Sequence, residues 1–336
     1  MTANIENFAR MSGTAPAWHG LGGIWSVNAT IEEKAVAAGL DWTVNDSPLI
    51  YRAGNQAIVD PTRKVFYRSD RPGSVLGVMS KQFEPVQPVE MLNFLDQMSN
   101  ELGLYIDTAG VLQGGAKYWA LATTDDTVEP VQNDIIKRHL LVATANDGSM
   151  STRLGPCNTR VVCQNTWNAA IARDGKNLMT INHRSRINWK ACRDYLLNQH
   201  NDFQLFGDIM AEFAKIEVNA EQAADFAREL IAPEWEAGKA PRKFTQFANT
   251  LSHGIGQREA GKTVYGLFNG VTRHVDHVRG RTSESRLNSA WFGAGAAMKN
   301  HAMELLIKNC VTKWGADSQM VPVVRETRYN ELLKAA

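Results

Sequence analysis

Long apolar runs are absent from this sequence of 336 residues, and so is an apolar segment near its start. The longest apolar runs, such as residues 140–143 and 294–298, are far shorter than the about 20 residues that a membrane-spanning helix needs. Residues 1–10 contain Glu6 and Arg10 and lack the apolar core of a signal peptide. We therefore expect no membrane segment and a cytoplasmic location.

Cysteine is also scarce, with Cys157, Cys163, Cys192 and Cys310 as its four positions. Their spacing lacks the close pairs of a zinc ribbon or a disulfide framework, which favours a reducing compartment. No histidine lies at a sequence spacing from Cys163 that would indicate an activated nucleophile. We expect buried, unreactive cysteines, no catalytic residue and no cofactor.

Strong compositional bias is missing as well. Apolar residues make up 44% and charged residues 21% of the chain, which excludes the disordered and fibrous classes. Because compact domains usually hold about 100–200 residues, this length fits two domains or one large α+β unit with added helices.

The net charge is only +1, but the charges fall in four blocks of alternating sign. Such blocks arise from solvated helix faces, or from a basic surface for a polyanion beside acidic surfaces that pair with it in neighbouring subunits. The blocks are −6 over residues 96–136, +8 over 137–193, −8 over 194–236 and +6 over 239–286.

The first part of the chain contains local signals for two helices. Residues 1–26 are rich in Gly and Trp without periodicity, and we expect no regular element there. A short helix follows, with Thr30 and Glu33 as a capping box and Gly39 at its end. Short β-type runs fill residues 40–86, and a second helix occupies residues 88–103.

Three further strands are expected at residues 104–112, 116–123 and 135–145, the last two joined by a polar loop. Asn158 and Thr159 then favour the start of a helix, since the apolar positions after them have helical spacing. The chain beyond residue 184 has mostly helical spacing.

The fold class that follows is α+β: a helix, a three-stranded antiparallel meander and another helix, with a largely helical C-terminal half. Composition divides the chain into an N-terminal arm with a short helix (1–39), an α+β core (40–182) and a mostly helical region (183–336).

Residues 256–263 match the phosphate-binding P-loop pattern. A working P-loop joins a buried strand to a helix, whereas residues 244–252 have helical spacing, and Glu259 would lie close to bound phosphate. We expect a basic turn here, with a nucleotide-dependent enzyme as the third functional hypothesis. His274 and His277 are metal-ligand types without a third ligand of matching spacing, so we expect a surface histidine pair and no metal.

The block of charge +8 holds the candidate nucleic-acid interface. Arginine, asparagine and the free amides of a helix start form good contacts to phosphates and bases, whereas the alternative is a capped helix with solvated arginines. Tyr118 and Trp119 would add stacking platforms if they were exposed, although a buried core position is the more usual fate. The candidate binding residues are Lys137, Arg138, Arg153, Asn158, Arg160, Asn165, Arg184 and Arg186.

Several strings resemble the family called domain of unknown function 932, whose members are carried by phages and plasmids. The most specific is Arg160-Val-Val-Cys-Gln-Asn-Thr166. The resemblance runs over nearly the whole chain, and the family name assigns no activity. The other strings are Gly39-Leu-Asp-Trp42, Leu76-Gly-Val78, Phe83-Glu-Pro-Val-Gln87, Gly115-Ala-Lys-Tyr-Trp-Ala120, Asn146-Asp-Gly-Ser149 and Thr272-Arg-His-Val-Asp-His277.

The order of helix, meander and helix is also similar in topology to the single-strand annealing recombinases, including the phage RecT and Red-beta proteins. That analogy implies sequence-tolerant binding and annealing of single-stranded DNA by a homo-oligomer, as a ring or filament, inside a bacterial host cell. The alternative from another class is an interaction protein that blocks a host defence factor, with the acidic residues 194–236 as a nucleic-acid mimic.

Overall fold

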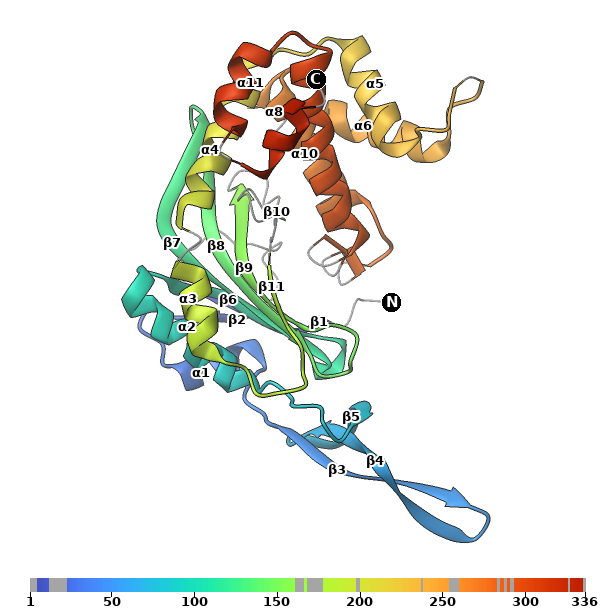
Figure 1. Cartoon of the computed structure of the whole chain (residues 1–336). Helices are drawn as coiled ribbons and strands as arrows, with labels where there is room; N and C mark the ends of the chain where they lie inside the picture. Colours follow the sequence, from blue (N-terminus) through green and yellow to red (C-terminus); the bar gives the residue numbers. More distant parts are fainter. Residues whose placement is uncertain are drawn as a thin grey trace. The chain divides into compact units, whose positions relative to one another are not determined.

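The structure is a computed structural model in which the chain forms two compact units (Figure 1). Unit 1 consists of Met1–Asp125, His139–Gly155 and Leu178–Asn198, and unit 2 of Asp126–Arg138, Pro156–Asn177 and Gln199–Ala336. The three segments expected from the sequence are defined by composition, and that division stays a prediction. The residues that the structure describes are 5–11, 23–160, 166–167, 178–197, 200–236, 238–253, 260–282, 285–286, 289–290, 293–325 and 327–334.

An eight-stranded sheet is the largest β element, with strand order β10-β9-β8-β7-β6-β1-β2 and with β11 paired to β9. The antiparallel pair β6 and β7 is joined by a tight turn, η1 (Gln113–Gly115), and β8 follows β7 both in the chain and in the sheet. The strands are β1 (Ile5–Met11), β2 (Gly23–Trp25), β6 (Tyr105–Leu112), β7 (Lys117–Val131), β8 (Asp134–Ala145), β9 (Thr152–Arg160), β10 (Thr166–Trp167) and β11 (Met179–Ile181).

Helices α1 (Ile31–Ala38) and α2 (Pro88–Leu102) begin and end where the sequence predicts. The Thr30 hydroxyl accepts a hydrogen bond from the Glu33 amide, and the Glu33 carboxylate accepts one from the Thr30 amide. Both helices end at a glycine in the left-handed region, Gly39 with φ 68° and Gly103 with φ 62°, which glycine adopts without strain. The two predicted helices are therefore confirmed.

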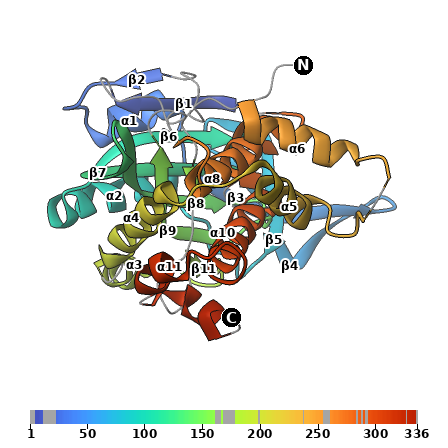
Figure 2. The same ribbon diagram turned by 90° about the horizontal axis from the view of Figure 1, so that it is seen from above.

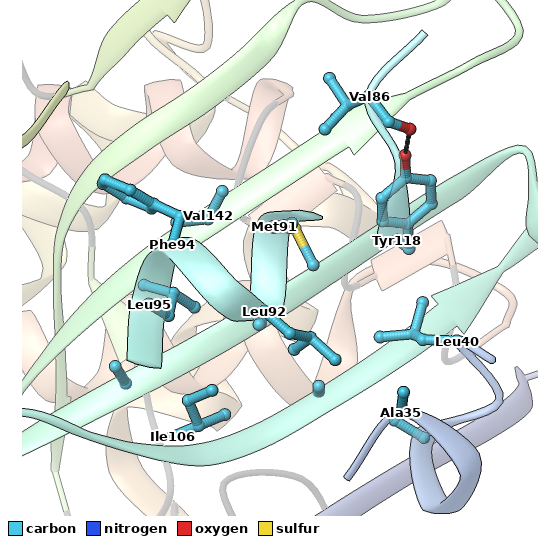
Figure 3. Packing of buried hydrophobic residues seen from close by; sticks show 14 of the residues in the cluster. Ala35, Leu40, Val86, Met91, Leu92, Phe94, Leu95, Ile106, Tyr118 and Val142 are labelled. Atoms are coloured by element: carbon cyan, nitrogen blue, oxygen red, sulfur yellow. Dashed lines mark hydrogen bonds between the residues drawn. The ribbon is translucent and has the colours of Figure 1, made fainter. Parts of the chain in front are cut away.

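The apolar stripe of α2 builds the core of unit 1. Its side chains point toward the strands of the sheet, as Figure 3 shows. Positions three and four residues apart lie on one face of a helix, so the stripe is buried while the opposite face is open to water. The residues that pack together here include Met91, Leu92, Phe94 and Leu95 of α2, and Ile106, Tyr118 and Val142 of the sheet.

A second, three-stranded antiparallel sheet comprises β3 (Val44–Ala53), β4 (Gln56–Arg68) and β5 (Arg71–Ser80). Strand β5 pairs only with residues 63–68 of β4, so β3 and β4 continue alone as a two-stranded hairpin (Figure 1). Ile50 and Val59 lie opposite each other on this hairpin and are 59% and 53% exposed. The hairpin therefore carries a cross-strand pair of apolar side chains that are exposed to solvent.

Unit 2 is mostly helical, and its longest helix, α10, packs against α5, α8 and α11, while α6 packs against α5 and α8 (Figure 2). Its core includes Phe213, Phe247 and Leu306. The helices are α4 (His200–Lys215), α5 (Ala220–Ile231), α6 (Arg242–His253), α8 (Val264–Arg273), α10 (Ala294–Thr312) and α11 (Asp317–Val324), with a π-helical turn η2 (His274–Val278) and a 3-10 helix η3 (Arg328–Lys334); α3 (Trp189–Leu197) belongs to unit 1.

The α+β class, the meander after α2 and the helical C-terminal half are thus confirmed. None of the helices in the described ranges has the length and apolar character to cross a bilayer.

Three local expectations are wrong. The N-terminal arm contains β1 and β2, because β1 forms the hydrogen-bonded neighbour of β6 in the sheet. The polar loop expected between β7 and β8 is mostly strand, since β7 continues to Val131 and leaves only residues 132–133 as the turn. Asn158 does not begin a helix; it lies in β9, where it pairs with Trp167 of β10.

Candidate nucleic-acid interface and basic cavity

The candidate cations on β8 and β9 are partly buried and have partners within the fold. Lys137 and Arg138 lie on β8 in unit 2, and an Arg138 guanidinium nitrogen lies 3.5 Å from a carboxylate oxygen of Asp126. Arg153 lies on β9 in unit 1, opposite Thr180 of β11. Cations that already have partners offer less to a phosphate, so these three residues are weak candidates for an open interface.

Asn158, one of the two candidate amides, does not form the expected helix start. Asn158 is only 7% exposed and lies within a strand, so the predicted role at a helix N-terminus is wrong. Arg160 is the last residue of β9, and its side chain lies outside the described residues. Asn165 also lies outside the described residues.

Arg184 and Arg186 are the exposed candidates of unit 1. Across the part of the chain that the structure describes, neither guanidinium has a carboxylate or another polar group as a partner. They follow β11 directly, in a segment with no regular secondary structure. Two exposed cations without polar partners, two residues apart, are suited to binding successive phosphates of a flexible strand.

A partly buried network fixes the start of this segment through His183. The imidazole Nδ1 lies 3.1 Å from the Glu84 carbonyl oxygen, and Nε2 lies 3.4 Å from the hydroxyl oxygens of both Thr144 and Thr152. A carbonyl can only accept, so Nδ1 carries the proton and Nε2 accepts from a threonine hydroxyl. Burial lowers the pKa of His183 below its usual value, and the ring stays neutral at pH 7.

The aromatic residues considered as stacking platforms are core residues. Tyr118 is 1% exposed and Trp119 is 3% exposed. The Tyr118 hydroxyl donates to the Val86 carbonyl oxygen (Figure 3) and accepts from the Asn146 side-chain amide at 2.9 Å. A base cannot stack on either ring in this fold, so the stacking role is wrong. Tyr118 instead holds the segment before α2 against the sheet.

The candidate residues are divided between the two units, and a single continuous basic stripe stays a prediction. Arg153, Arg184 and Arg186 belong to unit 1. Lys137, Arg138 and Asn158 belong to unit 2.

A cavity of about 880 Å³ in unit 2 is the site that the sequence did not predict. It lies among the C-terminal end of α5, the first turns of α6 and α10, and the π-helical turn η2. No carboxylate is found among the described residues that line it. Its charged and titratable lining residues are Arg242, Lys243, His274, Arg279, Arg281 and His301, and its apolar lining includes Leu230, Ile231, Val278, Ala297 and Met298.

The π-helical turn that forms one wall of the cavity is anchored by a buried ion pair between Lys299 of α10 and Asp276 of η2. Close backbone approach adds to this anchor, because a methyl group on Gly295 would lie 2.6 Å from a methyl carbon of Val275. The small residues near the start of α10 therefore allow close packing against η2. They bring η2 close enough to place His274 and Arg279 at the cavity.

His274 is buried and neutral at pH 7. Burial and the nearby Arg279 lower its pKa to about 4. Its ring contacts the Phe247 ring edge-on, and its Nδ1 lies 3.5 Å from the Thr250 hydroxyl. The expected surface pair with His277 is wrong for His274. Among the described residues, no three His, Cys, Asp or Glu side chains form a group that would hold a metal ion.

The P-loop pattern lies after a helix. Residues 256–259 are outside the described residues, and α6 occupies the place where a P-loop needs a buried strand. Thr263 is the N-cap of α8 and accepts a hydrogen bond from the Gly266 amide at 3.1 Å, while Lys262 is exposed. This geometry agrees with the expectation that the pattern is not a working nucleotide site.

The comparison with protein families gives one match. The family model described as "Domain of unknown function (DUF932)" covers residues 75–291, about two thirds of the chain, so the chain belongs to this family. The resemblance expected from the sequence is confirmed over this region, and the string at residues 39–42 lies outside it. The matched region includes the meander, β9, α6 and η2. Neither the curated proteins nor the solved structures contain a match.

Proposed function

We propose that this protein binds single-stranded nucleic acid without sequence preference, and that it anneals or recombines phage or plasmid DNA in the cytoplasm of a bacterial cell. One observation carries the proposal: both basic blocks present exposed cations that have no carboxylate partner within the described residues. Those used in the argument are Arg184 and Arg186 in unit 1, and Arg242 and Lys243 in unit 2.

The physical reason is that an open cation, which has no carboxylate partner, binds a phosphate more readily than a paired cation does. A cation with its own carboxylate must give up that partner before it binds a new anion, whereas an open one exchanges only water and counterions. In the acidic block the cations are paired: Lys215 lies 2.6 Å from Glu212, and Arg228 lies 2.8 Å from Asp225. The open cations used here therefore lie in the basic blocks.

The cytoplasmic location is part of the proposal. Cys157, Cys192 and Cys310 are buried thiols outside any disulfide bond, which supports a compartment where thiols stay reduced.

Self-association is the second part of the proposal. The alternating blocks of charge provide complementary surfaces for head-to-tail contacts between copies of the chain, which form a ring if they close and a filament if they do not. Light scattering with and without single-stranded DNA tests this part. A strict monomer at every concentration, in both conditions, would contradict it.

The interaction protein that mimics nucleic acid is the weaker candidate. Several carboxylates of the acidic block are neutralised locally, as in the pairs of Glu212 and Asp225 above and of Glu229 with Lys313 at 3.1 Å. Each internal pair weakens the negative field that a mimic must present.

The test is a gel-shift titration with single-stranded DNA and RNA oligonucleotides over a series of salt concentrations. Replacing Arg184 and Arg186 together by Ala should weaken binding equally for all sequences. The slope of log affinity against log salt should fall by about 0.7 for each phosphate that the variant no longer neutralises. The matched control is Lys215→Ala with Arg228→Ala, which removes the same charge from cations that are paired.

Two results would contradict the proposal. The first is no binding of either nucleic acid by the parent protein at low salt. The second is an equal reduction of affinity in the control, because the effect would then come from net charge and not from the open cations.

A further inference from the structure

The cavity in unit 2 has the electrostatics of an anion site. Arg242, Lys243 and Arg281 have no ion-pair partner among the described residues, and Arg279 bonds to the Ala294 carbonyl oxygen, at 3.3 Å, and to the Met298 sulfur, at 3.7 Å. With no carboxylate in its described lining, the cavity collects four positive charges that nothing there neutralises. Such a concentration of positive charge is unfavourable unless an anion offsets it.

The two helices that begin at the cavity strengthen the same field. The N-terminus of a helix carries partial positive charge, and proteins usually place acidic side chains there. Neither α6 nor α10 has an acidic residue in its first turn, and α6 begins instead with Arg242 and Lys243. Gly293, the N-cap of α10, has no side chain to accept the free amides, and the Ser289 hydroxyl accepts only one of them, that of Gly295, at 3.1 Å. Both helix starts therefore favour an anion, because no acidic side chain offsets their partial positive charge.

The remaining wall of the cavity is apolar and suits a flat ring that lies against it. Leu230 and Ile231 come from α5, Val278 from η2, and Ala297 and Met298 from α10. A volume of about 880 Å³ lies at the upper end of the usual ligand range, about 300–1,000 Å³. Methionine sulfur adapts readily to aromatic rings. His274, whose pKa lies near 4, is neutral at pH 7 and adds a polar group without further charge.

We propose that this cavity binds a nucleotide, with the phosphate held by Arg242, Lys243, Arg279 and Arg281 and the base lying against the apolar wall. The arginine forks bind phosphate oxygens in pairs, and the free amides of α6 and α10 add donors for the same group. The nucleotide is either free or the phosphorylated end of a strand, since both share this chemistry. In the second case the inference deepens the proposed function and rests on it.

The test is isothermal titration calorimetry of the full-length protein with deoxyadenosine 5′-monophosphate (dAMP), deoxyadenosine and inorganic phosphate. Binding of dAMP should be at least ten-fold tighter than that of deoxyadenosine, because the phosphate carries most of the interaction. Inorganic phosphate should compete with it. A 5′-phosphorylated oligonucleotide that binds more tightly than the same oligonucleotide with a 5′-hydroxyl identifies the strand end as the source, and equal binding identifies the free nucleotide.

Two variants test the basic part and the apolar part of the cavity separately. Arg242→Ala with Lys243→Ala should weaken dAMP binding at least ten-fold, whereas Lys215→Ala with Arg228→Ala, the same change of charge in the acidic block, should leave it within two-fold. Ala297→Trp fills the apolar part from an exposed position without changing any charge and should also abolish binding. Lys262→Ala separates the cavity from the P-loop pattern and should have no effect.

The outcomes are distinguishable from those of the proposed function. No dAMP binding at millimolar concentration, or binding that survives both cavity variants, overturns the cavity assignment even if oligonucleotides bind. Binding of dAMP that the cavity variants abolish, without any affinity for oligonucleotides, supports the cavity and contradicts the proposed function. Abolished binding only in Lys262→Ala moves the site to the P-loop pattern and also overturns the cavity assignment.

Discussion

The Lys299 ammonium nitrogen lies 2.6 Å from a carboxylate oxygen of Asp276, and the two side chains are 1% and 0% exposed. Removing one member of such a pair leaves the other charged and buried, which costs about 3–5 kcal/mol. We predict that Asp276→Asn or Lys299→Met each lowers the free energy of unfolding by this amount in urea titrations. The double variant Asp276→Asn with Lys299→Met should cost less than the sum of the two, and additive effects would show that the pair is not coupled.

Gly295 is predicted to be intolerant of a single methyl group. A Cβ atom there would lie 2.6 Å from a methyl carbon of Val275 and 2.8 Å from the Ser289 carbonyl oxygen. Alanine normally stabilises a helix relative to glycine, but this overpacking should cost about 1–3 kcal/mol. Thermal unfolding measures the destabilisation. The control Gly73→Ala has no heavy atom within 4 Å of the added carbon and should unfold like the parent.

Acid should destabilise the protein through His274. In the unfolded chain His274 titrates near its usual pKa of about 6.5, whereas in the folded protein burial and Arg279 lower its pKa to about 4. The unfolded state therefore binds more protons between these values, and stability falls as the pH drops from about 6.5 to about 4, by at most about 3 kcal/mol for this residue. Burial shifts His183 in the same direction.

The measurement is the free energy of unfolding at pH 7 and pH 4.5 for the parent and for His274→Gln, which cannot take up a proton. The charged side chains that line the cavity together with His274 are Arg242, Lys243, Arg279 and Arg281. The variant should lose less stability than the parent over the interval, and parallel pH profiles would contradict the assignment.

The polar cluster of Asn146 is predicted to be essential for the fold of unit 1. The Asn146 side chain accepts from the Val86 amide at 3.3 Å and donates to the Val86 carbonyl oxygen at 3.2 Å and to the Tyr118 hydroxyl at 2.9 Å. Asn146→Ala leaves these buried groups without their partner, so we expect a decrease of about 2–4 kcal/mol in urea titrations. Gln97→Ala, on the exposed face of α2, is the control and should change stability by less than about 0.5 kcal/mol.

The features that the sequence predicted depend on neighbours a few residues apart. The capping box of Thr30 and Glu33, the glycines that end α1 and α2, and the apolar stripe of α2 are local signals, and each is present in the structure. The three strands of the meander follow each other in the chain, so their order was also accessible.

The features that were missed depend on residues far apart in the chain. The cap signal at Asn158 is overridden by pairing of β9 with β10 and β11, and the N-terminal arm forms a strand because β6, about 100 residues later, offers it an edge. The cavity requires the ends of α5, α6 and α10 to meet at η2. Its only trace in the sequence is the basic block over residues 239–286, with Arg242 and Lys243 directly after Pro241.

The β3–β4 hairpin turns at Gly54 and Asn55, and the family match begins only at residue 75, after the hairpin has ended. An inserted peptide at this turn would interrupt neither a buried residue nor the region shared with the family. The tip is therefore an attachment point for an affinity tag or a fluorophore, through which the protein can be immobilised or followed in single-molecule experiments while its two cores stay intact.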